Sequence, residues 1–234
     1  MRWWHDMRDL VIVAHPDDEA LGLSGHLVGS DAHVLFVTDG TPDPRIDPTP
    51  YEHRPYSDEY RAMRRAEAQR SLAIAGISSY GFLDLPCQEV SSHLDDLVFM
   101  IRDEIERIRP ERVITHDYEG GNLDHDLVSI AVHATSSAPV WRFPLYHLEA
   151  SGIVHAKPVR VEAGIPIAVP AQRAAMIDAY ASQAHETRWF TQVNEEWLLP
   201  TRLQDFTLRV PIQYERRHPG AYTAIALPFS EVVR

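Results

Sequence analysis

The first residues whose types and spacing suggest chemistry form the tetrapeptide His15-Pro16-Asp17-Asp18 near the N-terminus. It follows directly on a short apolar run, residues 10–14, which is typical of a buried strand. Open α/β sheets bind ligands outside the carboxyl ends of their strands, so an imidazole and two carboxylates stand where a ligand is expected. His15 and Asp18 can supply nitrogen and oxygen ligands to a cation such as zinc, which leaves Asp17 free to act on a water molecule as a base.

A structural role for the same carboxylates is the main alternative. Asp17, Asp18 and Glu19 could cap the N-terminus of a helix, where acids are favoured by unpaired amide groups and by the helix dipole. A bare run of three acids would not distinguish capping from metal binding. The His-Pro pair directly before them, at the end of the first strand, favours the metal site.

A second group of polar residues follows another short apolar run, residues 112–115, in the sequence HDYEGGNLDHD of residues 116–126. Because this group also stands after a strand and before a helix, it can meet the first group across the sheet. His125 is a candidate third metal ligand. Asp124 or Asp126 could orient its second ring nitrogen, as carboxylates around metal sites commonly do.

The elements that must hold these groups alternate between short apolar runs and helical patterns. Predicted strands cover residues 10–14, 33–38, 80–83 and 112–115, and predicted helices cover residues 19–28, 57–75, 91–108 and 124–136. This alternation predicts an α/β fold with a parallel sheet covered by helices on both faces. A length of 234 residues predicts a single domain, residues 1–234.

The remaining segments carry weaker patterns. Residues 140–169 favour β structure, residues 171–184 favour a further helix, and the rest of the chain is predicted to be an irregular tail. Residues 41–55 contain five prolines and predict a loop. At this edge of an α/β sheet, such a loop can cover a ligand crevice.

The net charge and the cysteine content limit which class of partner and which cellular location are expected. A formal net charge of −12 argues against binding to DNA, RNA or anionic membranes, which depends on basic patches, so a small-molecule substrate is expected. The N-terminal residues resemble neither a signal peptide nor a membrane span, and the single cysteine, Cys87, excludes an internal disulfide. We therefore expect a cytoplasmic protein, and the sequence is compatible with a homo-oligomer.

Two motifs together carry a family resemblance. The sequence AHPDDEALGLSG of residues 14–25, followed by GGNLDHD of residues 120–126, resembles the N-acetylglucosaminylphosphatidylinositol de-N-acetylases, also called PIG-L or LmbE-like deacetylases. Shorter similarities lie between and after the motifs, at residues 38–40, 65–68, 82–84 and 173–183. The resemblance covers most of residues 9–138. It implies a Rossmann-like, three-layer α/β/α fold with a mostly parallel sheet.

The resemblance also implies roles for individual residues. By similarity to the family, His15, Asp18 and His125 would hold the metal, which is zinc in our interpretation, with Fe²⁺ or another divalent metal as alternatives. Asp17 would be the general base, and Arg65 would contact the substrate. The implied reaction is the hydrolytic removal of an N-acyl group, N-acetyl in our interpretation, from an amino sugar or a small molecule that contains one.

One departure from the family pattern concerns the second motif, where Asn122-Leu123 replaces the usual His-Pro. An asparagine can donate a hydrogen bond, but it cannot deliver a proton to the departing amine. His116 is a candidate substitute for the missing histidine. Backbone amides near Gly22 or Gly25, or the side chain of Asn122, could stabilise the developing oxyanion.

Three other functions compete with a sugar deacetylase. A nucleotide-dependent oxidoreductase is excluded, because no G-x-G-x-x-G sequence follows the first strand and two carboxylates there would repel pyrophosphate. A catalytically weak, metal-binding member with a binding or regulatory role is motivated by Asn122. An amidase acting on a non-sugar N-acyl substrate is the third alternative.

Overall fold

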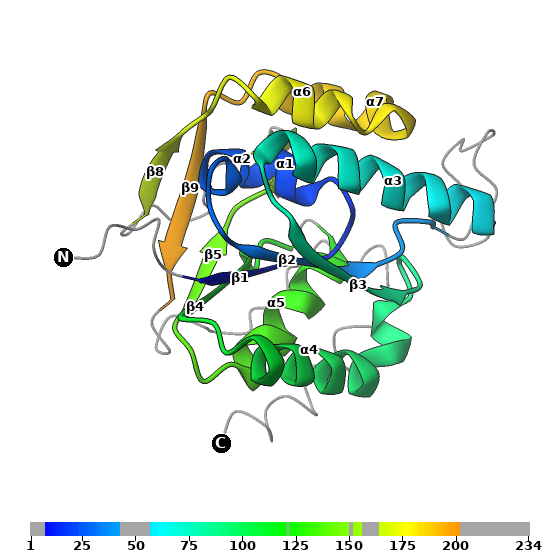
Figure 1. Ribbon diagram of the computed structural model, residues 1–234, viewed down its shortest axis with the longest axis vertical. Helices are drawn as coiled ribbons and strands as arrows, with labels where there is room; N and C mark the ends of the chain where they lie inside the picture. The colour runs from blue at the N-terminus through cyan, green and yellow to red at the C-terminus, as the bar shows by residue number, and fades with distance from the viewer. Residues whose placement is uncertain (1–7, 43–56, 121, 150–151, 156–163, 202–234) are drawn as a thin grey trace.

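The centre of the fold is a seven-stranded sheet with the strand order β3-β2-β1-β4-β5-β9-β8 (Figure 1). A computed structural model describes residues 8–42, 57–120, 122–149, 152–155 and 164–201. The first five strands of the order are parallel, whereas β9 is antiparallel to both of its neighbours. The sheet strands are β1 (Asp9–Val13), β2 (His33–Thr38), β3 (Ser79–Leu85), β4 (Arg112–His116), β5 (Val140–Phe143), β8 (Ile165–Ala168) and β9 (Glu195–Pro200).

Alternating side chains of the central strands enter two hydrophobic cores, one on each face of the sheet. In β1, Val11 and Val13 belong to one core, while Leu10 and Ile12 belong to the other. Every residue of β1 and β2 is buried. Central parallel strands are covered on both faces, which explains why they appear in the sequence as continuous apolar runs.

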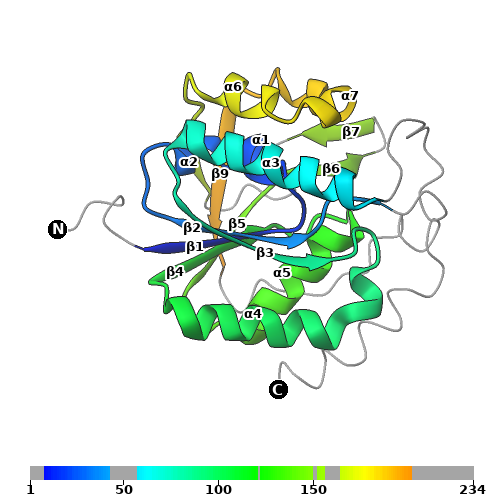
Figure 2. The same ribbon diagram turned by 45° about the vertical axis from the view of Figure 1, so that its right-hand side comes forward.

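Helices cover both faces of this sheet and make three layers. Helices α1, α2, α3 and α6 lie over one face, and α4 and α5 lie over the other (Figures 1 and 2). The predicted α/β/α architecture is therefore confirmed. The helices are α1 (Asp18–Gly22), α2 (Ser24–Leu27), α3 (Asp58–Ala75), α4 (Leu94–Ile108), α5 (Leu123–Thr135), α6 (Arg173–Asp178) and α7 (Ala184–Thr187), with 3₁₀ turns η2 (Val90–His93), η3 (Ala181–Gln183) and η4 (Arg188–Phe190).

The ends of α3 show why the sequence begins and ends this helix where it does. The Ser57 hydroxyl accepts a hydrogen bond from the backbone N–H of Tyr60 at 3.1 Å, which satisfies one of the free amides of the first turn. At the other end, Gly76 has φ 83° and ends the helix in the left-handed conformation that glycine adopts without strain. The helix over residues 57–75 was thus predictable from its two ends.

Three predicted elements differ from those in the structure. The predicted helix 19–28 is broken into α1 and α2 because Leu23 leaves the helical conformation, with φ −134° and ψ 11°. The predicted helix 171–184 is shorter, since Tyr180 is also non-helical, with φ −91° and ψ 55°. The tail was predicted to be irregular, yet residues 195–200 form β9, whose pairing with β5 and β8 is long-range and leaves no local signal.

Two further segments complete the described part of the chain. A separate hairpin of β6 (Tyr146–Glu149) and β7 (Gly152–His155) lies beside the sheet (Figure 2). The predicted proline-rich loop lies outside the described residues from position 43 onward. Among the described helices, none combines the length and the apolar character needed to cross a membrane.

The order of the strands brings the two sequence motifs together. Strands β1 and β4 are adjacent and parallel, with Ile12 paired to Thr115. Their carboxyl ends therefore lie at the same edge of the sheet. The chain continues from β1 into α1 and from β4 towards α5, so both groups of polar residues stand at this edge.

Candidate metal centre and active site

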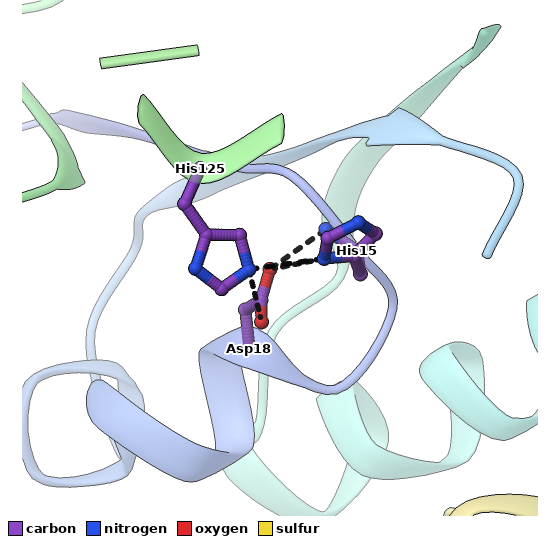
Figure 3. A group of neighbouring side chains, drawn as sticks. All are labelled: His15, Asp18 and His125. Atoms are coloured by element: carbon purple, nitrogen blue, oxygen red, sulfur yellow. Dashed lines mark hydrogen bonds and ion pairs between the residues drawn. The ribbon is translucent and has the colours of Figure 1, made fainter. Parts of the chain in front are cut away.

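Two imidazoles and a carboxylate converge at the edge of the sheet, as Figure 3 shows. His15 follows β1, Asp18 is the first residue of α1, and His125 lies in the first turn of α5. His15 Nδ1 lies 3.0 Å from His125 Nε2, and the two carboxylate oxygens of Asp18 lie 3.4 Å from these same nitrogen atoms. One donor atom from each residue fits within a 4.8 Å cluster.

The chemistry of this donor set fits a divalent metal. Two imidazole nitrogens and one carboxylate oxygen are ligands that zinc accepts, and three protein ligands leave a position open for water or substrate. Burial by itself raises the pKa of Asp18, but the neighbouring imidazole of His125 outweighs this effect and holds the pKa well below its usual range. Asp18 is therefore a charged carboxylate in a site that is almost closed to solvent.

The outer nitrogen of His15 is held by a second carboxylate. His15 Nε2 lies 3.1 Å from Asp124 Oδ2, which also accepts the backbone N–H of Gln88 at 2.7 Å. Asp124 therefore orients His15, whereas the sequence analysis assigned Asp124 or Asp126 to His125. Asp126 instead accepts the backbone amides of Glu119 and Gly120 and so orders the loop before α5.

Asp17 is buried beside this cluster in an unusual backbone conformation. Its φ is 125° and its ψ is −28°, a region that costs a non-glycine residue about 1–3 kcal/mol and persists only where neighbours impose it. Two contacts impose it here. The Asp17 N–H donates to Glu19 Oε2 at 3.1 Å, and Arg64 donates to Asp17 Oδ2 at 3.0 Å. Burial raises the pKa of Asp17 to about 7, although Arg64 acts in the opposite direction.

Arg64 is a site residue that the sequence analysis did not identify. Its guanidinium is buried and contacts the Pro16 carbonyl as well as Asp17 and Glu67. Arg65, which the family resemblance assigned to the substrate, lies on the partly exposed side of α3, where it pairs with Asp84. Arg64 could have been identified in the sequence from its spacing to Glu67, because residues three apart on a helix can form an ion pair.

Substitution of Arg64 and of its neighbour Arg65 tests whether the buried arginine, but not the partly exposed one, stabilises the fold. Arg64→Lys is expected to lower the free energy of unfolding by about 1–3 kcal/mol, because lysine cannot make the branched set of hydrogen bonds and leaves buried acceptors unsatisfied. Arg65→Lys, at a surface pair, should change it by less than about 0.5 kcal/mol. Urea denaturation of both variants measures the contrast. Equal effects would contradict the structural role given to Arg64.

His116 lies behind the metal centre and is fully buried. Its Nε2 accepts the backbone N–H of Ala14 at 2.9 Å, and its ring stacks on His125 with 4.1 Å between centroids. Burial, followed by the neighbouring His125, lowers the pKa of His116 to about 3. His116 is therefore a neutral imidazole that packs against His125, and it is not placed to protonate a departing amine.

Of the candidate oxyanion donors, the Gly25 amide and the Asn122 side chain have other partners, and Gly22 is closely packed. The backbone N–H of Gly25 donates to Glu196 Oε2 at 2.7 Å, so it points away from the metal centre. Gly22 packs against Phe143, where an added Cβ would lie 2.6 Å from the ring. Asn122 caps α5: its Oδ1 accepts the Asp124 N–H at 2.9 Å.

Tyr146 is a second residue that the sequence analysis missed. Its hydroxyl accepts a hydrogen bond from Asn122 Nδ2 at 3.0 Å, and the edge of its ring meets His125 at 5.4 Å between centroids. It lies 24 residues after Asn122 in the sequence and belongs to the β6–β7 hairpin. No local spacing connects it to the site.

Solved structures with the same fold include enzymes of more than one kind. The A40926 pseudoaglycone deacetylase Dbv21 is 18% identical, with a TM-score of 0.62 over 83% of this chain and 96% of that one. A triple mutant of a deacetylase from the teicoplanin biosynthetic pathway is 19% identical, with a TM-score of 0.65 over 82% and 97%. GalB from Pseudomonas putida, a 4-carboxy-2-hydroxymuconate hydratase, is 18% identical, with a TM-score of 0.61 over 84% and 97%.

Sequence comparison supplies the family. No curated protein is significantly similar in sequence to this chain. The family model described as PIG-L: GlcNAc-PI de-N-acetylase matches residues 10–136, more than half of the chain, and this stretch contains both polar motifs. The resemblance drawn from those motifs is thereby confirmed, and the chain belongs to the PIG-L family of GlcNAc-PI de-N-acetylases.

Proposed function

We propose that this protein is a metal-dependent hydrolase that removes an N-acyl group, in the first place N-acetyl, from an amino sugar or a small molecule that contains one. The observation that carries the proposal is the convergence of His15, Asp18 and His125 beside the buried carboxylate of Asp17. The family description, which names the removal of acetyl from an N-acetylglucosamine conjugate, supports the substrate class.

In this proposal His15, Asp18 and His125 hold the cation, which we take to be zinc, with Fe²⁺ or another divalent metal as alternatives. When bound, such a cation supplies Lewis acidity, which lowers the pKa of water from ~15.7 to about 7 and polarises an amide carbonyl. Asp124 fixes the orientation of His15 through its outer nitrogen. Carboxylates in this position typically influence metal affinity by about 10- to 100-fold.

Asp17 moves the proton in the proposed reaction. Arg64 holds Asp17 Oδ2, so Oδ1 is the oxygen that remains to accept a proton from the attacking water. The water oxygen forms a bond to the acyl carbon, and the carbon–nitrogen bond then breaks. The same carboxyl group returns its proton to the departing nitrogen. The products are a carboxylic acid and an amine, which at neutral pH exchange a proton and leave as a carboxylate and an ammonium ion.

The direct test is hydrolysis of a panel of N-acetylated compounds by zinc-loaded and iron-loaded protein. The panel contains N-acetylglucosamine, glucosaminides with a range of aglycones, and N-acetyl amino acids as non-sugar amides. Acetate and primary amine are measured together and should appear in equal amounts from at least one sugar. Release from amino acids alone would favour a non-sugar amidase, and metal binding without any release would favour a binding or regulatory role.

The remaining parts of the proposal rest on the sequence. We expect a single domain, a cytoplasmic location and a small-molecule partner, and a homo-oligomer is compatible with these properties. The net charge of −12 is the observation behind the choice of a small molecule over nucleic acid. Size-exclusion chromatography with light scattering of the purified chain measures the oligomeric state directly.

A further inference from the structure

The side chain of Asn122 has a defined orientation because its two ends make different bonds. Its Oδ1 accepts the backbone N–H of Asp124 at 2.9 Å, as the capping residue of α5. This bond identifies which end of the amide is oxygen. The other end, Nδ2, therefore donates to the Tyr146 hydroxyl oxygen at 3.0 Å.

This bond determines what the tyrosine can do with its own proton. Since the Tyr146 oxygen accepts from Asn122, the hydroxyl proton must point elsewhere. Among the residues that the structure describes, Asn122 is the single hydrogen-bond partner of this hydroxyl. The O–H group is thus available as a donor to a ligand. A tyrosine hydroxyl ordinarily loses its proton only at about pH 10, so the group carries its proton at neutral pH.

Tyr146 is held beside the metal centre from three directions. Its ring meets His125 edge-on, with an interplanar angle of 64°. Asn122 caps α5 and His125 lies in its first turn, three residues further on, so the two side chains are neighbours at this end of the helix. The backbone is also anchored, because Glu119 Oε2 accepts the N–H groups of Leu145 at 2.7 Å and of Tyr146 at 3.1 Å.

We propose that Tyr146 is a catalytic residue that donates a hydrogen bond to the carbonyl oxygen of the scissile N-acyl group, and that Asn122 is its positioning residue. The inference rests on the proposed hydrolase function and names the donor that stabilises its oxyanion. As water adds to the acyl carbon, the carbonyl oxygen gains negative charge, and a fixed donor then binds it more strongly than it binds the ground state.

This arrangement also accounts for the asparagine in the second motif. Asn122 cannot deliver a proton, but it can cap the helix and orient a donor that comes from another part of the chain. The hydroxyl comes from β6, and the amide that directs it comes from α5. His116, the candidate substitute from the sequence, is occupied by the Ala14 amide and is fully buried.

The first test is Tyr146→Phe, which retains the ring against His125 and removes only the hydroxyl. We expect kcat to fall about 10- to 100-fold, the equivalent of one hydrogen bond to a charged group, while KM changes less than about threefold. Tyr80→Phe, at a partly exposed tyrosine of β3, is the matched control and should retain full activity. A kcat within about twofold of the wild type in Tyr146→Phe would overturn the proposal.

The second test separates the capping role of Asn122 from its positioning role. Serine is a good capping residue but has no amide group to hold the tyrosine, so Asn122→Ser should fold normally and still lower kcat. Once the hydroxyl is gone, the same change should have no further effect, and the double variant should equal Tyr146→Phe. Fully multiplicative losses would show that Asn122 acts independently of Tyr146.

A third measurement does not depend on turnover. Acetohydroxamate carries an acyl carbonyl and binds metal centres, and its dissociation constant can be measured by calorimetry on the zinc-loaded protein. We expect Tyr146→Phe to weaken binding about fivefold or more, equivalent to a hydrogen bond. If no N-acetyl sugar is hydrolysed by the wild type, the proposed function fails, while this comparison still decides the role of Tyr146. Equal binding by the two proteins would reject that role.

Discussion

Replacing the three converging residues is expected to remove bound metal and hydrolytic activity together. The wild type should carry about one equivalent of divalent metal, and His15→Ala, Asp18→Ala and His125→Ala should each lose most of it, because each removes a third of the donor set. Without the cation, water keeps a pKa of ~15.7, and hydrolysis should fall by at least ~10³-fold. Elemental analysis of protein purified without added chelator measures the metal content.

The control for this experiment is a histidine outside the cluster. His93 lies before α4 and is paired with Asp96, so His93→Ala should leave both metal content and activity unchanged. Circular dichroism and thermal unfolding of each variant show whether the fold is retained. Full metal occupancy in the triple variant would show that His15, Asp18 and His125 are not the ligands.

The second large effect is expected at the carboxylate that we propose as the base. Asp17→Asn should retain the metal and the fold but lower kcat by about 10²–10⁴-fold, since an amide cannot accept the proton from water. The substitution suits the local structure. Asparagine is among the residues that adopt positive φ most readily, and its amide oxygen can still accept the hydrogen bond from Arg64.

The matched control lies after the neighbouring strand. Asp39 follows β2, is buried, and pairs with Arg61 rather than with the converging residues. Asp39→Asn should therefore have a much smaller effect on kcat than Asp17→Asn. Metal analysis of both variants confirms that the comparison is made between loaded enzymes. Near-normal turnover by Asp17→Asn on a substrate that the wild type hydrolyses would place the base elsewhere and leave Asp17 with only its structural role as the partner of Arg64.

Loss of a metal ligand, loss of Asp17 and loss of the Tyr146 hydroxyl should each have a different effect on the enzyme. Loss of a ligand removes the cation, loss of the base leaves the cation without a proton acceptor, and loss of the hydroxyl removes one donor from the transition state. Metal content, kcat and acetohydroxamate binding distinguish these three cases. The three measurements together assign each residue to one step of the proposed reaction.

The sequence by itself determined most of the fold that holds the site. Continuous apolar runs predicted β1, β2 and β4 because central parallel strands are buried on both faces, and their lengths agree with the structure within about one residue. The helix ending at Gly76 was predictable because glycine adopts the left-handed conformation that ends it. Both polar motifs follow a strand directly, which placed them at one edge of the sheet.

Other features were decided only by tertiary structure. The choice between Arg64 and Arg65 depended on which side of α3 faces the first motif, and adjacent helical residues point in different directions. The orientation of Asp124 towards His15 also depended on how the loops meet. A spacing in the sequence specifies neighbours within one turn or strand, but it does not specify which side chain crosses a gap between elements.

The contrast is sharpest between His125 and Tyr146. His125 was predictable because it belongs to a motif in which strand, loop and helix are continuous in sequence. Tyr146 reaches the same site from a hairpin whose start is anchored by Glu119, which accepts the backbone amides of Leu145 and Tyr146. Strand β9 was not predictable for the same reason, because its place in the sheet depends on pairing with β5 and β8, which are separate segments of the chain. Local sequence determines the elements and their ends, whereas packing of distant segments decides which groups complete the site.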